Sequence, residues 1–302
     1  MSSPQPQSRL LPPVILMVSS PTATPLADQS PLPIQSNPPA KPPRDPHPRI
    51  KHIRLVLKIS DLSCQGARNL ISTVNVITTV EEAVGSVFRW LYTAESTVPG
   101  TRSVTLVLRS MGGIAYTTGK DIDDDHKEIH FSTDYIAKIS PERMKDEILG
   151  VICHEMVHCF QFDGCHTSPS GLTEGIADWV RLRSGLSPPS WKKSADGNWD
   201  DGYEHTGYFL EYLEQRFGEG SVRRINEMLG KTSYEEEIFW KDLFGHRVTE
   251  LWKDYGRMLK EDSATDDIVI VENGESLDGD ASSLTPPESV KTDDTGAGEG
   301  VV

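Results

Sequence analysis

Length, composition and charge limit the kinds of partner this chain can have. Its 302 residues carry a formal net charge of −15. Nucleic acids and anionic membranes are themselves negatively charged, so we expect neither as a partner. No apolar run approaches the length of a membrane span, so we expect no membrane insertion. The composition leaves the oligomeric state open.

The two ends of the chain differ in composition from its middle. Residues 1–49 carry 14 of the 21 prolines, and residues 260–302 contain twelve acidic residues against two lysines. Segments of this kind cannot build an apolar core, so we predict that both ends are disordered. The middle, residues 50–259, is long enough for a single domain with one core.

An apolar stretch near the start of the chain has some features of a secretion signal. Residues 10–18 follow Arg9, but Pro12 and Pro13 interrupt them and leave only residues 14–18 unbroken. Such a stretch is too short for the apolar segment of a signal peptide. The sequence therefore favours a cytoplasmic location, with secretion as the alternative.

The first half of the middle region has the pattern of strands. Residues 52–59 and 103–108 alternate apolar and polar side chains and predict two strands, with a helix over residues 66–93 between them. Residues 114–132 predict an antiparallel hairpin around a polar loop at residues 121–125. The aspartates of that loop lack the spacing of a calcium-binding loop, which favours a solvated hairpin tip.

A helix carrying the central motif follows the strands. Ser140-Pro141-Glu142 is typical of a helix start, and the helical pattern runs through His158 to about Phe162. Its apolar positions predict a core-facing stripe on one side, with His154 and His158 on the opposite side. The stripe consists of Leu149, Ile152, Met156 and Phe160.

Helical patterns fill the rest of the middle region. The predicted helices cover residues 172–183, 203–217, 221–229, 234–244 and 248–259. Strands come first and helices later, which indicates an α+β fold with a mixed or antiparallel sheet followed by a helical half.

The segment from His154 to His158 reads His-Glu-Met-Val-His and points to metal-dependent hydrolysis. Two histidines four positions apart lie on one face of a helix, so both imidazoles can bind a single Zn²⁺. Glu155 lies beside them, where a carboxylate can deprotonate a water molecule. The pattern is that of H-E-x-x-H metalloproteases.

A catalytic zinc site needs a third protein ligand and one open position. Glu174 and Asp178 lie four residues apart on the next predicted helix, so their side chains share one face. We predict Glu174 as the ligand and Asp178 as the acceptor that orients a ligating histidine, because this assignment gives both acids a role. The reverse assignment, with Asp178 on the zinc, stays open.

The four cysteines do not suggest another kind of zinc site. Cys153 and Cys159 lie on the predicted motif helix and point in different directions, and a bridge between Cys64 and Cys165 has no support from the sequence. We therefore expect reduced thiols. The cysteines also lack the paired C-x-x-C spacing of a structural zinc module.

Residues 150–161 and 171–181 resemble the plant basic secretory protein family, whose members are zinc peptidases also found in fungi and bacteria. The likeness extends over most of residues 50–258. It implies a zincin-like fold and metallopeptidase activity on peptide or protein substrates, with His154 and His158 as ligands and Glu155 as the catalytic residue. The acidic charge and the lack of a clear secretory leader are departures, so location and partner are not carried over.

The expected reaction is peptide-bond hydrolysis with one catalytic zinc, in which Glu155 accepts a proton from water and passes it to the leaving amine. The oxyanion needs a further donor. Tyr203 is our first candidate because it follows a glycine in a polar segment that matches the family pattern, and His205 and Tyr208 come next. A tyrosine packed at a helix start is the alternative for Tyr203.

A second class of function is a catalytically silent interaction protein that keeps the zincin fold and recruits a basic partner with its acidic tail. The intact Glu155 argues against this class, because a structural site does not need a general base.

Overall fold

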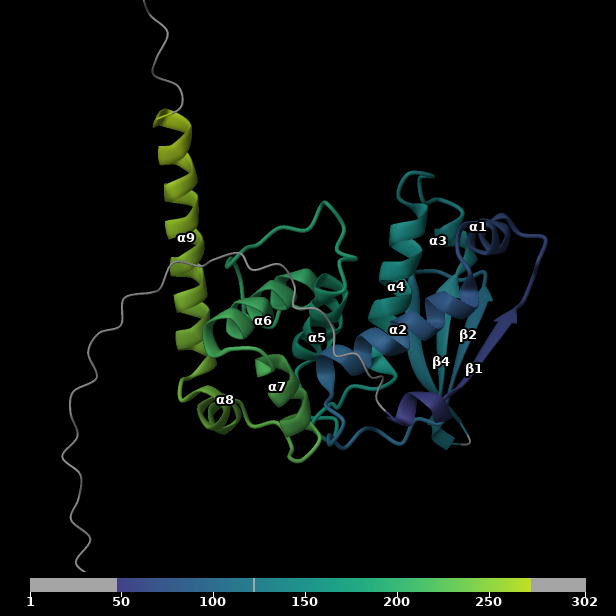
Figure 1. Ribbon diagram of the computed structural model, residues 1–302, viewed down its shortest axis with the longest axis horizontal. Coiled ribbons are helices and arrows are strands. Elements are labelled where there is room, and N and C mark those ends of the chain that lie inside the picture. The colour runs from purple at the N-terminus through teal and green to yellow at the C-terminus, as the bar shows by residue number, and fades with distance from the viewer. Residues whose placement is uncertain (1–47, 122, 273–302) are drawn as a thin grey trace, which may run out of the picture. The chain divides into compact units, whose positions relative to one another are not determined.

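The computed structural model describes residues 48–121 and 123–272. Predictions for the proline-rich segment and for the tail beyond residue 272 lie outside these residues. In the described part of the chain a mixed four-stranded sheet is combined with nine α-helices, which confirms the α+β class (Figure 1).

The sheet has the strand order β1-β2-β4-β3. Strands β1 (Arg54–Ile59), β2 (Ser103–Arg109) and β4 (Asp123–Ser132) run parallel, and β3 (Ala115–Lys120) pairs antiparallel with β4. The predicted hairpin is therefore confirmed, but β4 begins at Asp123, inside the polar loop predicted at residues 121–125. Because β4 inserts between β2 and β3, strand β3 lies at the edge of the sheet.

The predicted helices occur in the predicted order, and the short helix α3 is an addition that the sequence patterns did not predict. A short 3₁₀ turn at Pro48–His52 precedes β1. The α-helices are α1 (Gln65–Thr73), α2 (Val76–Leu91), α3 (Thr133–Ile136), α4 (Met144–His158), α5 (Ser170–Arg183), α6 (Tyr203–Phe217), α7 (Ser221–Leu229), α8 (Glu236–Phe244) and α9 (Val248–Glu272). The limits predicted for α6 and α7 are confirmed, and α9 continues past residue 259, the predicted end of the domain.

Two helix predictions were wrong in their limits. The single helix predicted over residues 66–93 is two helices, because the Asn75 side chain accepts hydrogen bonds from the backbone N–H groups of Ile77 and Thr78 and starts α2. Helix α4 does not begin at Ser140. The N–H of Arg143 donates to the carbonyl oxygen of Ser140 at 3.1 Å, which closes a turn before the helix begins.

Helix α4 lies in the middle of the fold. It packs against α2, β3 and β4, and also against α5 (Figure 1). The predicted stripe residues Ile152, Met156 and Phe160 are buried, whereas Leu149 is only half-buried. Val151 and His154, on other sides of the helix, are buried as well. Helix α5 packs against the side opposite the stripe, where His154 and His158 line a cleft.

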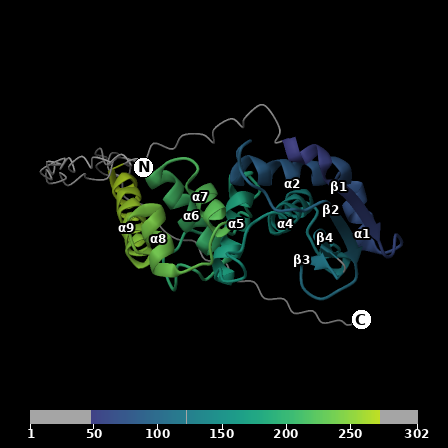
Figure 2. The ribbon, with the colours of Figure 1, turned by 90° about the horizontal axis from the view of Figure 1, so that it is seen from below.

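The sheet part and the helical part share one apolar core. Buried side chains from β2, β4, α2 and α4 belong to the same cluster as those from α5 to α9. Figure 2 shows α4 and α5 between the strands and helices α6 to α9. Among the described helices, none is both long enough and apolar enough to cross a bilayer. All four cysteines are free.

Substitutions at two helical glycines, Gly171 and Gly85, should change the free energy of unfolding in opposite directions. A Cβ atom at Gly171 in α5 would overlap the carbonyl oxygen of Asp200, whereas a Cβ atom at Gly85 in α2 would meet nothing within 4 Å. We predict that Gly171→Ala lowers the free energy of unfolding by about 1–3 kcal/mol. Gly85→Ala should raise it by about 0.5–1 kcal/mol, since alanine favours helix. Urea unfolding of both variants measures this, and equal stabilities would contradict the close approach at Gly171.

Candidate metal centre

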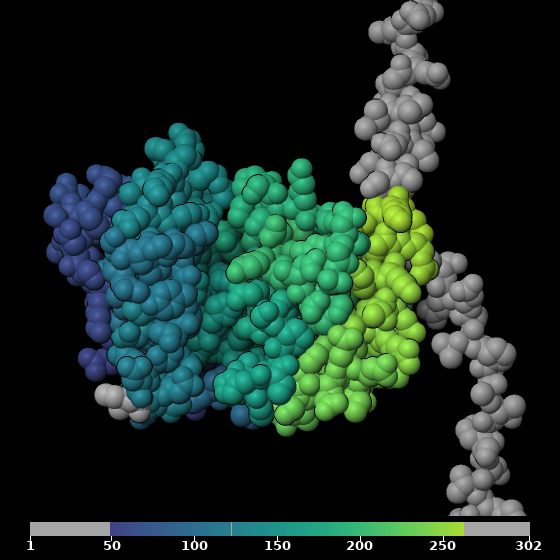
Figure 3. Space-filling view, turned by 180° about the vertical axis from the view of Figure 1, so that it is seen from behind, coloured from purple at the N-terminus to yellow at the C-terminus, as the bar shows by residue number. Residues whose placement is uncertain are grey.

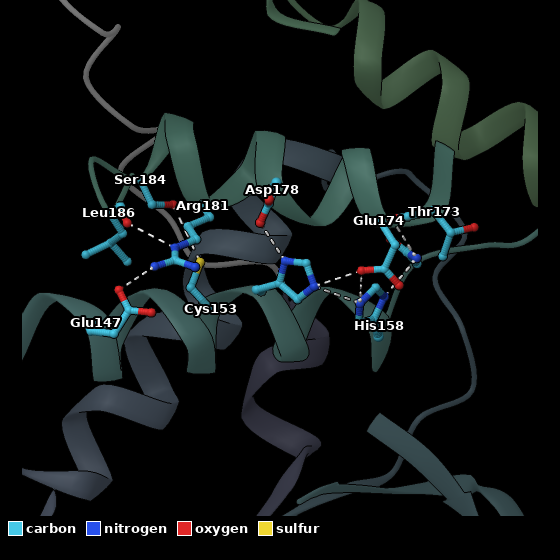
Figure 4. A network of polar contacts seen from close by, with 11 residues as sticks. Glu147, Cys153, His158, Thr173, Glu174, Asp178, Arg181, Ser184 and Leu186 are labelled. Carbon is cyan, nitrogen blue, oxygen red and sulfur yellow. Dashed lines mark hydrogen bonds and ion pairs between the residues drawn. The ribbon is translucent and has the colours of Figure 1, made fainter. Parts of the chain in front are cut away.

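Helices α4 and α5 run antiparallel and are joined by a series of polar contacts (Figure 4). Arg181 on α5 contacts Glu147 on α4 at 3.2 Å. Further along the pair, the two histidines of α4 meet Asp178 and Glu174 of α5. Each of these contacts joins buried or half-buried groups, so the helices are held in one register.

Gly150 lets the two helices approach at Arg181. A Cβ atom at this position would overlap the guanidinium group, which lies against α4. Arg181 also donates to the carbonyl oxygen of Leu186 at 3.0 Å and stacks on Trp191 at 5.3 Å. The buried positive charge is thus paired with Glu147 and hydrogen-bonded, as a buried charge requires.

Three atoms that could bind a metal converge between the helices. Nε2 of His154 lies 3.2 Å from Nε2 of His158 and 3.1 Å from Oε2 of Glu174, and the distance from His158 Nε2 to the same oxygen is 3.6 Å. Ligand atoms of a tetrahedral zinc, at bond lengths of about 2.0–2.2 Å, lie roughly 3.3–3.5 Å apart. Both the spacing and the nitrogen and oxygen donors therefore fit a metal ion.

Asp178 lies on the other side of the His154 ring. Its Oδ1 is 2.6 Å from Nδ1 of His154, and its side chain is only 4% exposed. The carboxylate can accept the Nδ1 hydrogen and leave Nε2 free for a ligand. Glu174, and not Asp178, is the acid whose oxygen lies beside both Nε2 atoms.

The Glu155 carboxylate is fixed by an unexpected neighbour. The hydroxyl of Thr117 on β3 lies 2.7 Å from Oε2 of Glu155 and 3.0 Å from the main-chain oxygen of the same residue. A threonine hydroxyl has one hydrogen to donate, and the shorter contact is to the carboxylate. The edge strand therefore orients a side chain of the motif helix.

Tyr203 lies over the site at the start of α6. Its ring is nearly parallel to that of His154, with the centroids 6.1 Å apart, and 55% of the residue is exposed. Its φ of +46° is in the left-handed region that non-glycine residues rarely adopt, and such strain is often found at functional sites. Gly202 before it has a φ of +90°.

The two other oxyanion candidates lie elsewhere. The imidazole of His205 contacts the carbonyl oxygen of Asn198 at 3.1 Å and packs on Trp252. Tyr208 packs edge-on against Trp191. Neither His205 nor Tyr208 lines the cleft that contains the two motif histidines.

The converging atoms open into a cleft of about 1000 Å³. Strand β3 forms one wall through Ala115 and Thr117, and α5 and the start of α6 form the other through Glu174 and Tyr203. The space-filling view shows the recess between the blue residues of the sheet and the green helices (Figure 3). A peptide could therefore reach the histidines from solvent.

Two contacts of the site were missed in the sequence. Gln161 lies one turn beyond His158, so its spacing could have suggested the contact between their side chains. Thr117 gave no such signal. Its contact with Glu155 depends on how the sheet packs against α4, which local spacing does not encode.

The comparisons with known proteins agree with the motifs. The profile of the BSP family, described as "Peptidase of plants and bacteria", matches residues 52–255. The chain belongs to this family. The resemblance inferred from the two central motifs is thereby confirmed. No curated protein and no solved structure matches the chain.

In this BSP-family chain the site shifts the pKa values of its own residues. Burial alone would lower the pKa of His154, but the hydrogen bonds to Asp178 and Glu174 raise it to about 9. Burial would raise the pKa of Glu174, but the contacts with His154 and His158 lower it well below its usual range. At neutral pH and without metal, the His154 ring is therefore positively charged, with a hydrogen on each nitrogen, and the Glu174 carboxylate is negatively charged.

This proton gives a pH dependence to metal binding. A histidine nitrogen must lose its proton to bind a metal, so protonation of His154 competes with binding below its pKa. We predict that the affinity for Zn²⁺ rises about tenfold per pH unit between pH 7 and 8.5. Titration against a chelator with a known pH dependence measures it. An affinity that falls or stays constant over this range would contradict the assignment.

Proposed function

We propose that this protein is a zinc-dependent peptidase with a zincin-like architecture that hydrolyses peptide bonds in an open cleft. The observation that carries the proposal is the convergence of two imidazole nitrogens and one carboxylate oxygen beside Glu155. Membership of a family described as peptidases supports the same reaction class.

His154, His158 and Glu174 would hold the zinc. Three protein ligands leave the fourth position of a tetrahedral site to water or substrate, as in catalytic zinc sites. When bound, zinc supplies a Lewis acid that polarises the scissile carbonyl and lowers the pKa of a water molecule. Asp178 would keep the His154 ring in the tautomer that presents Nε2.

Glu155 is the proposed general base. Glu155 is 6% exposed and lines the cleft, and one oxygen of its carboxylate accepts a hydrogen bond from the Thr117 hydroxyl. A carboxylate held in one orientation can accept the proton of the attacking water and later deliver it to the leaving amine. Thr117 would thus restrict the side chain of Glu155 without entering the reaction.

Tyr203 is the proposed donor to the oxyanion. A phenol keeps its hydrogen at neutral pH, and the negative charge of Glu174, together with burial, raises the pKa of Tyr203 further. A protonated hydroxyl beside the site can donate to the oxygen that becomes negative in the tetrahedral intermediate. The contact of its ring with His154 supports this location.

The substrate class we propose is an extended peptide. Among the described strands, β3 pairs with β4 alone, so its other edge retains main-chain groups for hydrogen bonding. Ala115, Tyr116 and Thr117 of this strand line the cleft. Addition of a peptide strand to such an edge is a recurring mode of recognition.

Replacement of the general base gives the direct test of catalysis. We predict that Glu155→Gln lowers kcat for casein or a peptide substrate at least about 100-fold, because the amide cannot accept the proton. Zinc content should stay at the wild-type level, since Glu155 is not a proposed ligand. Cleavage assays with metal analysis of the same samples measure both.

A matched variant controls for the change in charge. Glu237→Gln makes the same substitution on α8, at a side chain that is 66% exposed and outside the cleft, and should leave activity unchanged. Equal activity of Glu155→Gln and wild type would exclude the mechanism. Absence of cleavage by the zinc-loaded wild type would favour the silent interaction protein.

A further inference from the structure

Gln161 makes an unusual set of contacts behind His158. Its amide nitrogen Nε2 lies 3.1 Å from Nδ1 of His158 and 3.3 Å from the carbonyl oxygen of Thr173. Its amide oxygen Oε1 is buried and has no hydrogen-bond partner. A buried acceptor without a donor is destabilising, so this orientation of the amide leaves a polar group uncompensated.

A metal on the site requires a different hydrogen bond here. The neutral imidazole carries one hydrogen, and a ligating Nε2 must offer its lone pair to the metal. The hydrogen of His158 then lies on Nδ1, which becomes a donor facing the NH₂ group of Gln161. Two donors facing one another cannot form a hydrogen bond, so the partner of Nδ1 must be an acceptor.

We propose that the side-chain oxygen of Gln161 accepts the Nδ1 hydrogen of His158 and so makes Gln161 a positioning residue of the metal site. The inference rests on the proposed zinc site and deepens it. A rotation of the amide by half a turn exchanges Oε1 and Nε2 without moving the chain, since the two groups have nearly the same shape. The oxygen then lies beside Nδ1 of His158. The NH₂ group moves to the place where the oxygen lay before the rotation, and where no donor faced that oxygen.

The rotation exchanges one hydrogen bond for another. It gives up the hydrogen bond to the Thr173 carbonyl, which at 3.3 Å is near the long limit for such bonds, and leaves the Gln161 oxygen facing that carbonyl oxygen. In return it pairs the buried oxygen with an N–H group at 3.1 Å. The metal-bound tautomer of His158 and the rotated amide are therefore consistent with each other.

The two histidines would then be oriented by different chemistry. His154 is held by the carboxylate of Asp178, whereas His158 would be held by a neutral amide. Glu155, Glu174 and Asp178 already bring three carboxylates to this part of the cleft. An amide fixes the second ring without adding another negative charge to them.

Zinc affinity of the full-length chain tests the proposal, measured by competition with a chromophoric chelator. Gln161→Leu removes the acceptor and should weaken Zn²⁺ binding about 10- to 100-fold, as loss of a group that orients a ligand usually does. Gln161→Glu keeps an acceptor of the same shape and removes the donor, so it should bind Zn²⁺ within about threefold of wild type or more tightly. The matched control is Gln215→Leu, which makes the same change at an exposed position of α6.

The pair of variants separates the two roles of the amide. If Gln161→Glu loses as much affinity as Gln161→Leu, the hydrogen bond to Thr173 is what matters and the proposal is wrong. Wild-type affinity in both variants would also overturn it. If Gln161→Leu does not fold, as judged by its circular dichroism, a tenfold or greater loss in Gln161→Glu decides against the proposal. A wild-type chain without zinc affinity would overturn the proposed function itself, which is a different outcome.

Discussion

The antiparallel pairing of α4 and α5 is the constraint on which the site depends. Glu147 meets Arg181 and His154 meets Asp178 in a largely buried interface. A charge buried without its partner is strongly destabilising, so a shift of one helix along the other would leave several groups unpaired at once. The same register brings Glu174 to the two Nε2 atoms, which means that the contacts fixing the helices also assemble the donor set.

The other parts of the cleft are attached to this helix pair. The edge strand β3 packs on α4 and brings Thr117 to Glu155, and the turn into α6 holds Tyr203 over His154. One continuous core joins the sheet to the helical part, so these elements are supported by the same packing. A proposed general base, a proposed oxyanion donor and three candidate ligands thereby come from three separate helices, α4, α5 and α6.

Sequence patterns predicted what depends on spacing within one element. The four-residue spacing of His154 and His158, and of Glu174 and Asp178, placed each pair on one helix face. Relations across elements were beyond these patterns. The contact of Thr117 with Glu155 requires the packing of β3 on α4, and the burial of α4 on both sides requires α5. The break between α1 and α2 was missed because apolar periodicity continues through Asn75, whose side chain caps the second helix.

Metal analysis of the full-length protein tests the central claim most directly. Wild type exposed to Zn²⁺ and freed of excess metal should retain about one zinc per chain, and His158→Ala should lose it. The control is His205→Ala, a histidine on α6 that does not line the cleft and whose removal should leave the zinc in place. A wild type without zinc, or a His158→Ala variant that keeps it, would contradict the account.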